Sequence, residues 1–157
     1  MTFYTGNHLS DETVHLGPPA RSLLAGIPIA DDVAEPVRFW LEEAEKTDSI
    51  LYFAIYWQET WAGQILLHDM NPDTGESLIA YHLFDTDIRG KGIGSKALRL
   101  LINYVKNEIT LRKLVIITSR DNIASQRTAL KNGFGFIGPS REDPENGLVF
   151  VKKIYRE

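Results

Sequence analysis

Apolar and polar positions change their spacing several times along this chain of 157 residues, and each change predicts a different element. Residues 13–16 predict a short strand, and the proline- and glycine-rich stretch 17–30 predicts a loop with at most one helical turn. Apolar residues recur every three or four positions over 31–46, which predicts a helix with one buried face, capped by Asp31 or Asp32. Its apolar positions are Val33, Val37, Leu41 and Ala44.

Three β-branched and aromatic runs follow, over 50–57, 61–68 and 77–84. Short turns at 58–60 and 71–75 join them, and the second turn contains Asn, Pro, Asp and Gly. Because parallel strands need longer crossover connections, these runs predict an antiparallel meander.

The second half of the chain alternates between helical and strand patterns. From about residue 97, apolar residues at helical spacing predict a second helix that ends at about residue 107. The continuous apolar run 114–118 predicts a central strand covered on both faces. Asn122 is the expected cap of a short helix that ends at Asn132-Gly133. Two last strands are expected over 134–137 and 148–154. The order predicts an α/β fold with a mixed, mostly antiparallel central sheet and flanking helices.

Composition limits the alternatives. A hydrophobic content of 43% with no repeat or linker predicts a single domain over 1–157. No segment has the roughly 18 to 20 continuous apolar residues of a membrane span, and the first residues do not resemble a signal peptide. The lack of cysteine excludes disulfides and thiolate chemistry and fits a cytoplasmic protein. A net charge of −4 without a basic stripe argues against a nucleic-acid partner.

The segment 87–95 is the strongest chemical signal. Three glycines alternate with other residues between an apolar strand and an amphipathic helix, so the backbone can approach a ligand closely. The free N–H groups at the start of that helix favour an anion, and Arg89 and Lys91 add positive charge beside it. We therefore expect a ligand that carries a pyrophosphate.

Two common nucleotide-binding loops are excluded by spacing. The dinucleotide fingerprint needs G-x-G-x-x-G after a first strand, whereas here the glycines fall as G-x-G-x-G after three antiparallel strands. The P-loop needs Gly-Lys-Ser/Thr at a spacing that the chain lacks. A nucleotide-dependent oxidoreductase or NTPase is thus a weak alternative.

The run Arg89–Gly94 reads as Arg-x-x-Gly-x-Gly, and Asn122–Arg127 with Leu130–Phe134 form a second segment at a fixed distance. Together they resemble the coenzyme A loop and the Asn-x-x-Ser to Gly-Phe segment of the GNAT acetyltransferases. With Ala80-Tyr81 before the loop, the chain is most similar to the RimJ/RimL-type branch. The resemblance implies direct transfer of an acetyl group from acetyl-CoA to a primary amine, on a protein α-amino group or a small molecule. No metal is implied.

Two positions depart from the family pattern. Many members carry a tyrosine that protonates the leaving thiolate where this chain has Ala129, and the branch gives that task to the serine, here Ser125. Leu78 stands where the branch often carries Glu. A non-catalytic acyl-CoA-binding regulatory domain is therefore the alternative function. The sequence leaves the acceptor and the oligomeric state open, a homodimer included.

The expected site residues follow from the resemblance. Glu76 and His82 are candidates for the general base, and Ser125 for the general acid. Backbone N–H groups near Leu83 and Phe84 are expected to bind the thioester oxygen. The expected coenzyme A contacts are Leu83, Phe84, Arg89, Gly90, Lys91, Gly92, Ile93, Gly94, Ser95, Asn122 and Lys131.

Overall fold

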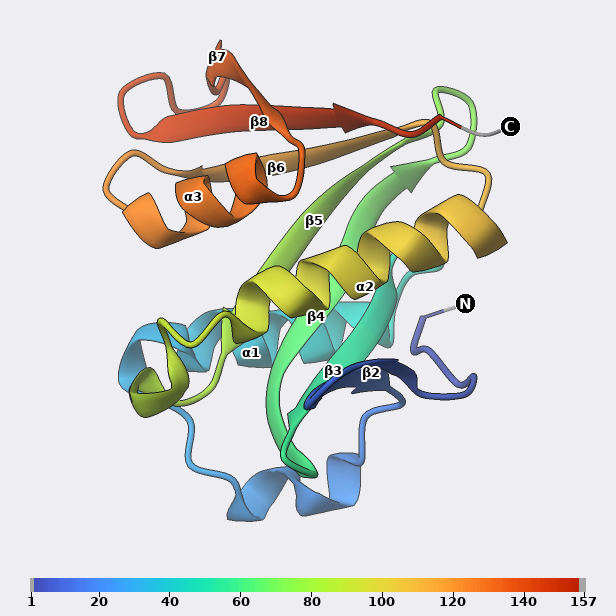
Figure 1. The fold of residues 1–157 in the computed structure, drawn as a ribbon, viewed down its shortest axis with the longest axis vertical. Helices are drawn as coiled ribbons and strands as arrows, with labels where there is room; N and C mark the ends of the chain where they lie inside the picture. The colour runs from blue at the N-terminus through green and yellow to red at the C-terminus, as the bar shows by residue number, and fades with distance from the viewer. Residues whose placement is uncertain (1, 156–157) are drawn as a thin grey trace.

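The computed structural model describes residues 2–155, and eight strands of this part form one sheet in the order β1-β2-β3-β4-β5-β6-β8-β7 (Figure 1). The strands are β1 (Leu9–Asp11), β2 (Val14–Gly17), β3 (Leu51–Trp57), β4 (Thr60–Asn71), β5 (Glu76–Leu83), β6 (Lys113–Ser119), β7 (Gly135–Pro139) and β8 (Gly147–Lys153). The helices are α1 (Asp31–Ala44), α2 (Ile93–Glu108) and α3 (Ile123–Lys131), with short 3-10 turns η1 (Arg21–Gly26) and η2 (Thr86–Ile88). The predicted mixed α/β fold is confirmed.

The sheet splits between β5 and β6. The predicted meander is confirmed, since β3, β4 and β5 pair antiparallel. By contrast, β5 and β6 pair in parallel, and only where Glu76–Leu78 lie opposite Lys113–Val115. Figure 1 shows the two strands diverging beyond this point, with α3 beside β6. Within residues 2–155, the remaining edge of β5 therefore has no strand partner on that side.

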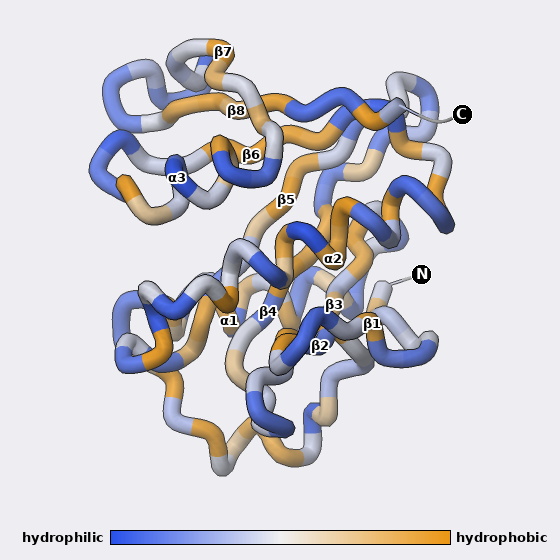
Figure 2. The backbone as a smooth tube through the Cα atoms, in the orientation of Figure 1, coloured by the Kyte–Doolittle hydropathy of each residue, from blue (hydrophilic) through white to orange (hydrophobic). Residues whose placement is uncertain are grey.

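Helices cover the two faces of the sheet. α2 packs over the face that carries Phe53, Ile65 and Ile79, and α1 over the opposite face, with Tyr52 and Leu66. Figure 2 shows apolar residues concentrated in the central strands and a hydrophilic loop between β7 and β8. Among the described residues, no helix is long and apolar enough to cross a membrane.

The helix predicted over 31–46 is present, but its predicted cap is wrong. Ala30 occupies the cap position without a side-chain hydrogen bond, and Asp31 and Asp32 are already in the first turn. Carboxylates are favourable there because they face the positive end of the helix dipole. The first turn of α1 is thus acidic where it approaches the glycine turn.

The strand predicted over 114–118 is present as β6, but it is not covered on both faces. Leu114 and Ile116 are buried, whereas Ile117 is 46% exposed. The reason is that α3 packs beside β6 on one face, while α1 lies across β5 and not across β6. An apolar run therefore did not distinguish a central strand from one with an open face.

The segment after β6 folds as predicted. The side chain of Asn122 caps α3 by accepting a hydrogen bond of 3.1 Å from the N–H of Ser125. Gly133 follows the helix with a φ of +87°, the left-handed conformation that favours glycine. β7 and β8 then form the predicted final hairpin. The pattern did not predict β1, which has only three residues.

Candidate active site

A cavity of about 600 Å³ lies where β5 and β6 separate. It is bordered by the end of β5, the glycine turn, the first turns of α1 and α2, and one face of α3. The expected site residues that line it are His82, Leu83, Arg89, Gly90, Gly92, Ile93, Gly94, Ser95, Asn122, Ser125 and Lys131. The structure thus brings both sequence motifs to one cavity. Glu76, Phe84 and Lys91 are not among the lining residues.

The glycine turn leaves open space above the start of α2. Gly90 and Gly92 have φ values of +80° and +83°, and a Cβ atom at either would meet nothing within 4 Å. The first helical bond runs from the N–H of Lys96 to the carbonyl of Gly92 at 3.0 Å. The N–H groups of Ile93–Ser95 precede it and have no helical acceptor. Backbone donors and open space together fit a pyrophosphate.

The edge of β5 offers a second set of backbone donors. The N–H of Phe84 donates to the carbonyl of Ala62 at 2.8 Å, so it is not free to bind a thioester oxygen. Because bonding alternates along an antiparallel ladder, the N–H groups of Tyr81 and Leu83 point away from β4, toward the split in the sheet. Leu83 keeps the geometry expected of an oxygen-binding amide, and Phe84 does not.

Two basic residues near the turn, Arg89 and Lys96, are each paired with a carboxylate. Arg89 donates to both carboxylate oxygens of Asp32 at 2.6 and 2.9 Å, and the bond lowers the pKa of Asp32. A third bond of 3.3 Å reaches the carbonyl of Leu83. Lys96 pairs instead with Glu12 at 3.0 Å. Arg89 therefore ties the first turn of α1 to the glycine turn, which the sequence did not indicate.

Ser125 has a hydroxyl neighbour that the sequence did not single out. The hydroxyl of Tyr81, on β5, donates to Oγ of Ser125 at 3.4 Å. A Cβ at Gly94 would lie 3.2 Å from the Tyr81 ring, so this glycine permits the close approach. Ala129, where many family members carry tyrosine, is fully buried in the core. The tyrosine hydroxyl at this site thus comes from a strand.

The two candidates for the general base lie in different places. His82 lines the cavity, and burial, followed by the nearby Arg89 guanidinium, lowers its pKa to about 4. Glu76 starts β5 and pairs with Lys113 at 3.0 Å. Glu76 and His82 are six positions apart along an extended strand, a distance of about 20 Å. Glu76 is therefore too far from the cavity to act there.

One face of α3 lines the cavity, and most of the residues on it were not predicted from the sequence. Ala124, Arg127, Thr128 and Lys131 recur at helical spacing along this face. Only Lys131 was expected. The polar periodicity of the helix was the signal that could have identified Arg127 and Thr128.

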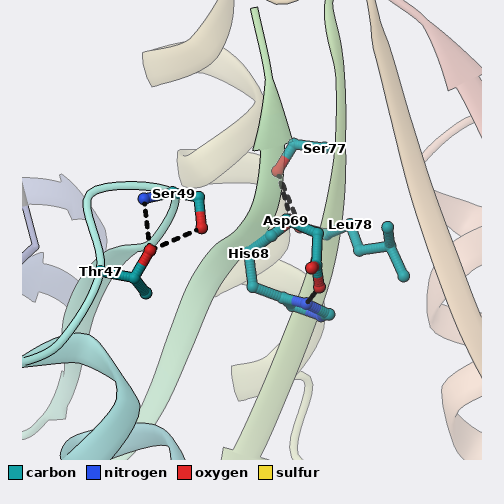
Figure 3. Close-up of polar contacts among 6 residues, drawn as sticks. All are labelled: Thr47, Ser49, His68, Asp69, Ser77 and Leu78. Carbon is teal, nitrogen blue, oxygen red and sulfur yellow. Dashed lines mark hydrogen bonds and ion pairs between the residues drawn. The ribbon is translucent and has the colours of Figure 1, made fainter.

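A serine, a histidine and an aspartate also meet at the other end of β4 and β5, but they do not form a nucleophilic triad. Nδ1 of His68 lies 2.7 Å from a carboxylate oxygen of Asp69. The hydroxyl of Ser77, however, donates to the backbone carbonyls of His68 and Leu78 at 3.1 and 3.0 Å (Figure 3). Ser77 is fully buried, so these contacts stabilise the strand pair rather than prepare a nucleophile.

A sheet that splits beside a glycine turn, with a cavity at the split, defines an α/β protein suited to an extended ligand that carries phosphate. The chain belongs to the acetyltransferase (GNAT) domain family, whose pattern matches residues 7–135. The family resemblance expected from the two motifs is thereby confirmed.

One known protein is similar to this chain in sequence, and two solved structures are similar to it in fold. The ribosomal-protein-serine acetyltransferase of Escherichia coli (strain K12) is 35% identical over 82 residues, which are 52% of this chain and 45% of that protein. The match thus spans less than half of that relative's length. A RimL ribosomal L7/L12 alpha-N-protein acetyltransferase in complex with coenzyme A has a TM-score of 0.75 at 18% identity, over 94% of this chain and 98% of that chain. The microcin C7 self immunity acetyltransferase MccE, in complex with acetyl-CoA and AMP, gives 0.69 at 19% identity, over 92% and 94%. At these identities the two structures show the shared fold.

Proposed function

We propose that this chain is an N-acetyltransferase that transfers an acetyl group from acetyl-CoA directly to a primary amine in a ternary complex. One observation carries the proposal: the glycine turn, the unpaired edge of β5 and Ser125 border the same cavity. Such a cavity can hold the pyrophosphate, the extended arm and the thioester of one ligand together.

The cradle fits coenzyme A as the co-substrate. The amides that open α2 would bind the pyrophosphate, and the amide of Leu83 would bind the thioester oxygen. Arg127 and Lys131 add positive charge to the α3 wall. The thioester supplies an electrophilic carbonyl carbon, and the protein orients it toward the amine.

The transfer has one bond made and one broken. The neutral amine nitrogen attacks the thioester carbonyl carbon, the carbon–sulfur bond breaks, and the amine loses its proton to water. Ser125 donates its hydroxyl proton to the leaving sulfur and regains a proton through the Tyr81 hydroxyl, which donates to its Oγ. The proton that the amine released to water restores Tyr81, so no charge is left on either hydroxyl. Tyr81 thus supports Ser125 in the task that a helical tyrosine performs in many family members.

The acceptor that fits best is a protein α-amino group. At pH 7 a lysine amine, with a pKa of about 10.4, is almost fully charged, whereas an α-amine near 8 is partly neutral. His82 has a pKa of about 4 and is a weak base, so an acceptor that needs little deprotonation is favoured. Two of the compared proteins are named as acetyltransferases of ribosomal proteins, which supports the same class. A cytoplasmic location and a homodimer stay predictions.

The test is a measurement of free coenzyme A released from acetyl-CoA with three acceptors. They are a peptide with a free α-amine, the same peptide with an acetylated N-terminus and one lysine, and a small diamine. We expect release with the first peptide and at most slow release with the second. Thermal shifts with acetyl-CoA, ATP and NADH provide the binding control. Stabilisation by acetyl-CoA without transfer to any amine would instead support a regulatory acyl-CoA-binding domain.

A further inference from the structure

A chain of buried polar side chains crosses the sheet beneath α1 and ends at the cavity. The hydroxyl of Tyr52 on β3 donates to Oε1 of Gln64 on β4 at 2.8 Å. Nε2 of Gln64 lies 3.0 Å from Nδ1 of His82 on β5. Tyr52 and Gln64 are fully buried, among apolar side chains such as Leu66. Because each of these buried groups is bonded to the next, the network holds its side chains in fixed orientations.

The direction of each hydrogen bond in this chain is determined by chemistry. Nε2 of Gln64 also lies 3.5 Å from the backbone carbonyl of Pro36, which can only accept. The amide nitrogen therefore faces Pro36 and His82, and the amide oxygen faces Tyr52. Burial raises the pKa of Tyr52, so its hydroxyl stays protonated and donates. Nδ1 of His82 must then accept, and the proton of the neutral ring is on Nε2.

Nε2 of His82 is the ring nitrogen open to the cavity. The His82 ring lines the cavity, and Nδ1 is occupied by Gln64. In the described part of the chain, every buried side-chain nitrogen or oxygen has a hydrogen-bond partner. Nε2 has no partner in that part, so it is accessible. The charged groups that border the same cavity are Asp32, Arg89, Arg127 and Lys131, and of these Arg89 and Asp32 are bonded to each other.

We propose that His82 is a fixed hydrogen-bond donor, through Nε2–H, to a carbonyl oxygen of a bound substrate, and that Gln64 and Tyr52 are positioning residues that hold its tautomer. The substrate part rests on the proposed acetyl transfer, whereas the tautomer does not. A donor held on the α1 face stabilises the oxygen as negative charge develops on it. The carbonyl belongs either to the thioester or to the amine-bearing substrate. His82 then does not act as the general base.

The tautomer is measured without any substrate. Long-range ¹H–¹⁵N correlation spectra of the ¹⁵N-labelled protein at neutral pH are expected to show His82 protonated on Nε2 only. Protonation on Nδ1, or a ring still half charged near pH 6.5, would overturn the proposal. In Gln64→Glu, a carboxylate of the same shape accepts from Nδ1–H and is expected to move the proton there. If this buried variant does not fold, the wild-type spectrum decides.

Two substitutions of His82 separate a donor from a base. The side-chain amide of His82→Gln keeps an N–H close to the Nε2 position but cannot act as a base, whereas His82→Leu removes both abilities. We expect kcat/KM within about threefold of wild type for Gln and a loss of about ten- to a hundredfold for Leu. Equal losses would overturn the donor role.

The kinetic parameters identify the carbonyl that His82 binds. A loss in kcat for His82→Leu indicates the thioester oxygen, and a rise in KM for the amine indicates the carbonyl of the acceptor. If wild-type protein acetylates no amine, the proposed function fails. The nitrogen spectra still confirm or overturn the tautomer in that case, so the two failures are distinguishable.

Discussion

Substitutions at Gly92 test the anion site because charge can be varied there with little change in packing. Gly92 has a φ of +83°, and a Cβ atom would meet nothing within 4 Å. The free protein should therefore fold with Ala, Asn or Asp, at a strain of about 1 kcal/mol for Ala and less for Asn, which tolerates this conformation better. Asp adds about 0.3 to 1 kcal/mol of stabilisation at the helix start.

Gly92→Asp is expected to weaken coenzyme A binding, although it stabilises the free protein relative to Gly92→Asn. A carboxylate about 5 Å from a phosphate charge is repelled by about 1 kcal/mol in water and about 3 kcal/mol near a protein surface. Two phosphate charges give a penalty of about 2 to 6 kcal/mol, which weakens binding by about thirtyfold or more. Gly92→Asn carries the same volume without the charge, so it should lose far less affinity.

Calorimetric titration of coenzyme A into wild type, Gly92→Asn and Gly92→Asp, at low and high salt, measures this difference. The gap between Asn and Asp should narrow as salt screens the exposed charges. Thermal unfolding without ligand should show Gly92→Asp at least as stable as Gly92→Asn. If Gly92→Asp binds coenzyme A within threefold of Gly92→Asn at low salt, the turn is not a phosphate site.

Three further outcomes are expected. Ser125→Ala should lower kcat by about a hundredfold, and Tyr81→Phe should lower it by less. The dissociation constant of coenzyme A, measured by titration, should not change in either variant. Weaker binding of coenzyme A would instead show that both residues bind the cofactor. Glu76→Gln should keep kcat/KM within about twofold of the wild-type value. In thermal unfolding it should lower stability by less than about 1 kcal/mol, because Glu76 and its partner Lys113 are both partly exposed. A large loss of kcat would show that a functional carboxylate lies at that end of β5. His82 has a pKa of about 4 when folded against its usual 6.5, so the folded protein binds fewer protons than the unfolded chain between these values. The free energy of unfolding should thus fall on acidification from pH 6.5 to 4, by up to about 3 kcal/mol, and denaturant titrations of His82→Gln should show a shallower fall.

The parts that the sequence predicted well are those whose geometry is local. The glycine turn and the Asn122 cap are each formed within a few consecutive residues. Their shape depends on backbone conformations that glycine and asparagine favour in any context. The spacing of apolar residues in strands and helices likewise depends on which side chains near neighbours bury. For this reason the bounds of the meander and of the final hairpin were predicted to within a few residues.

The parts that the sequence did not predict depend on register between distant strands and helices. Arg89 reaches Asp32 across 57 positions of the chain, and no local pattern indicates that pair. The same holds for Gln64 and His82, which become neighbours only because β4 and β5 pair in one particular register. Glu76 was a candidate base at the start of the strand that carries His82, but an extended strand separates the two residues by about 20 Å.

Ala129 illustrates how these two kinds of information interact. Compared with the family pattern, its lack of a hydroxyl gave weight to the alternative function, a domain that binds acyl-CoA without catalysis. That inference assumes that the hydroxyl must come from the same position of the same helix. Tyr81 lies on β5 instead, 44 positions from Ser125, and its hydroxyl donates to Ser125. Proton transfer to the leaving sulfur depends on where the hydroxyl lies in space, and not on which residue of the chain carries it. The absence of a tyrosine at position 129 is therefore weak support for a non-catalytic protein.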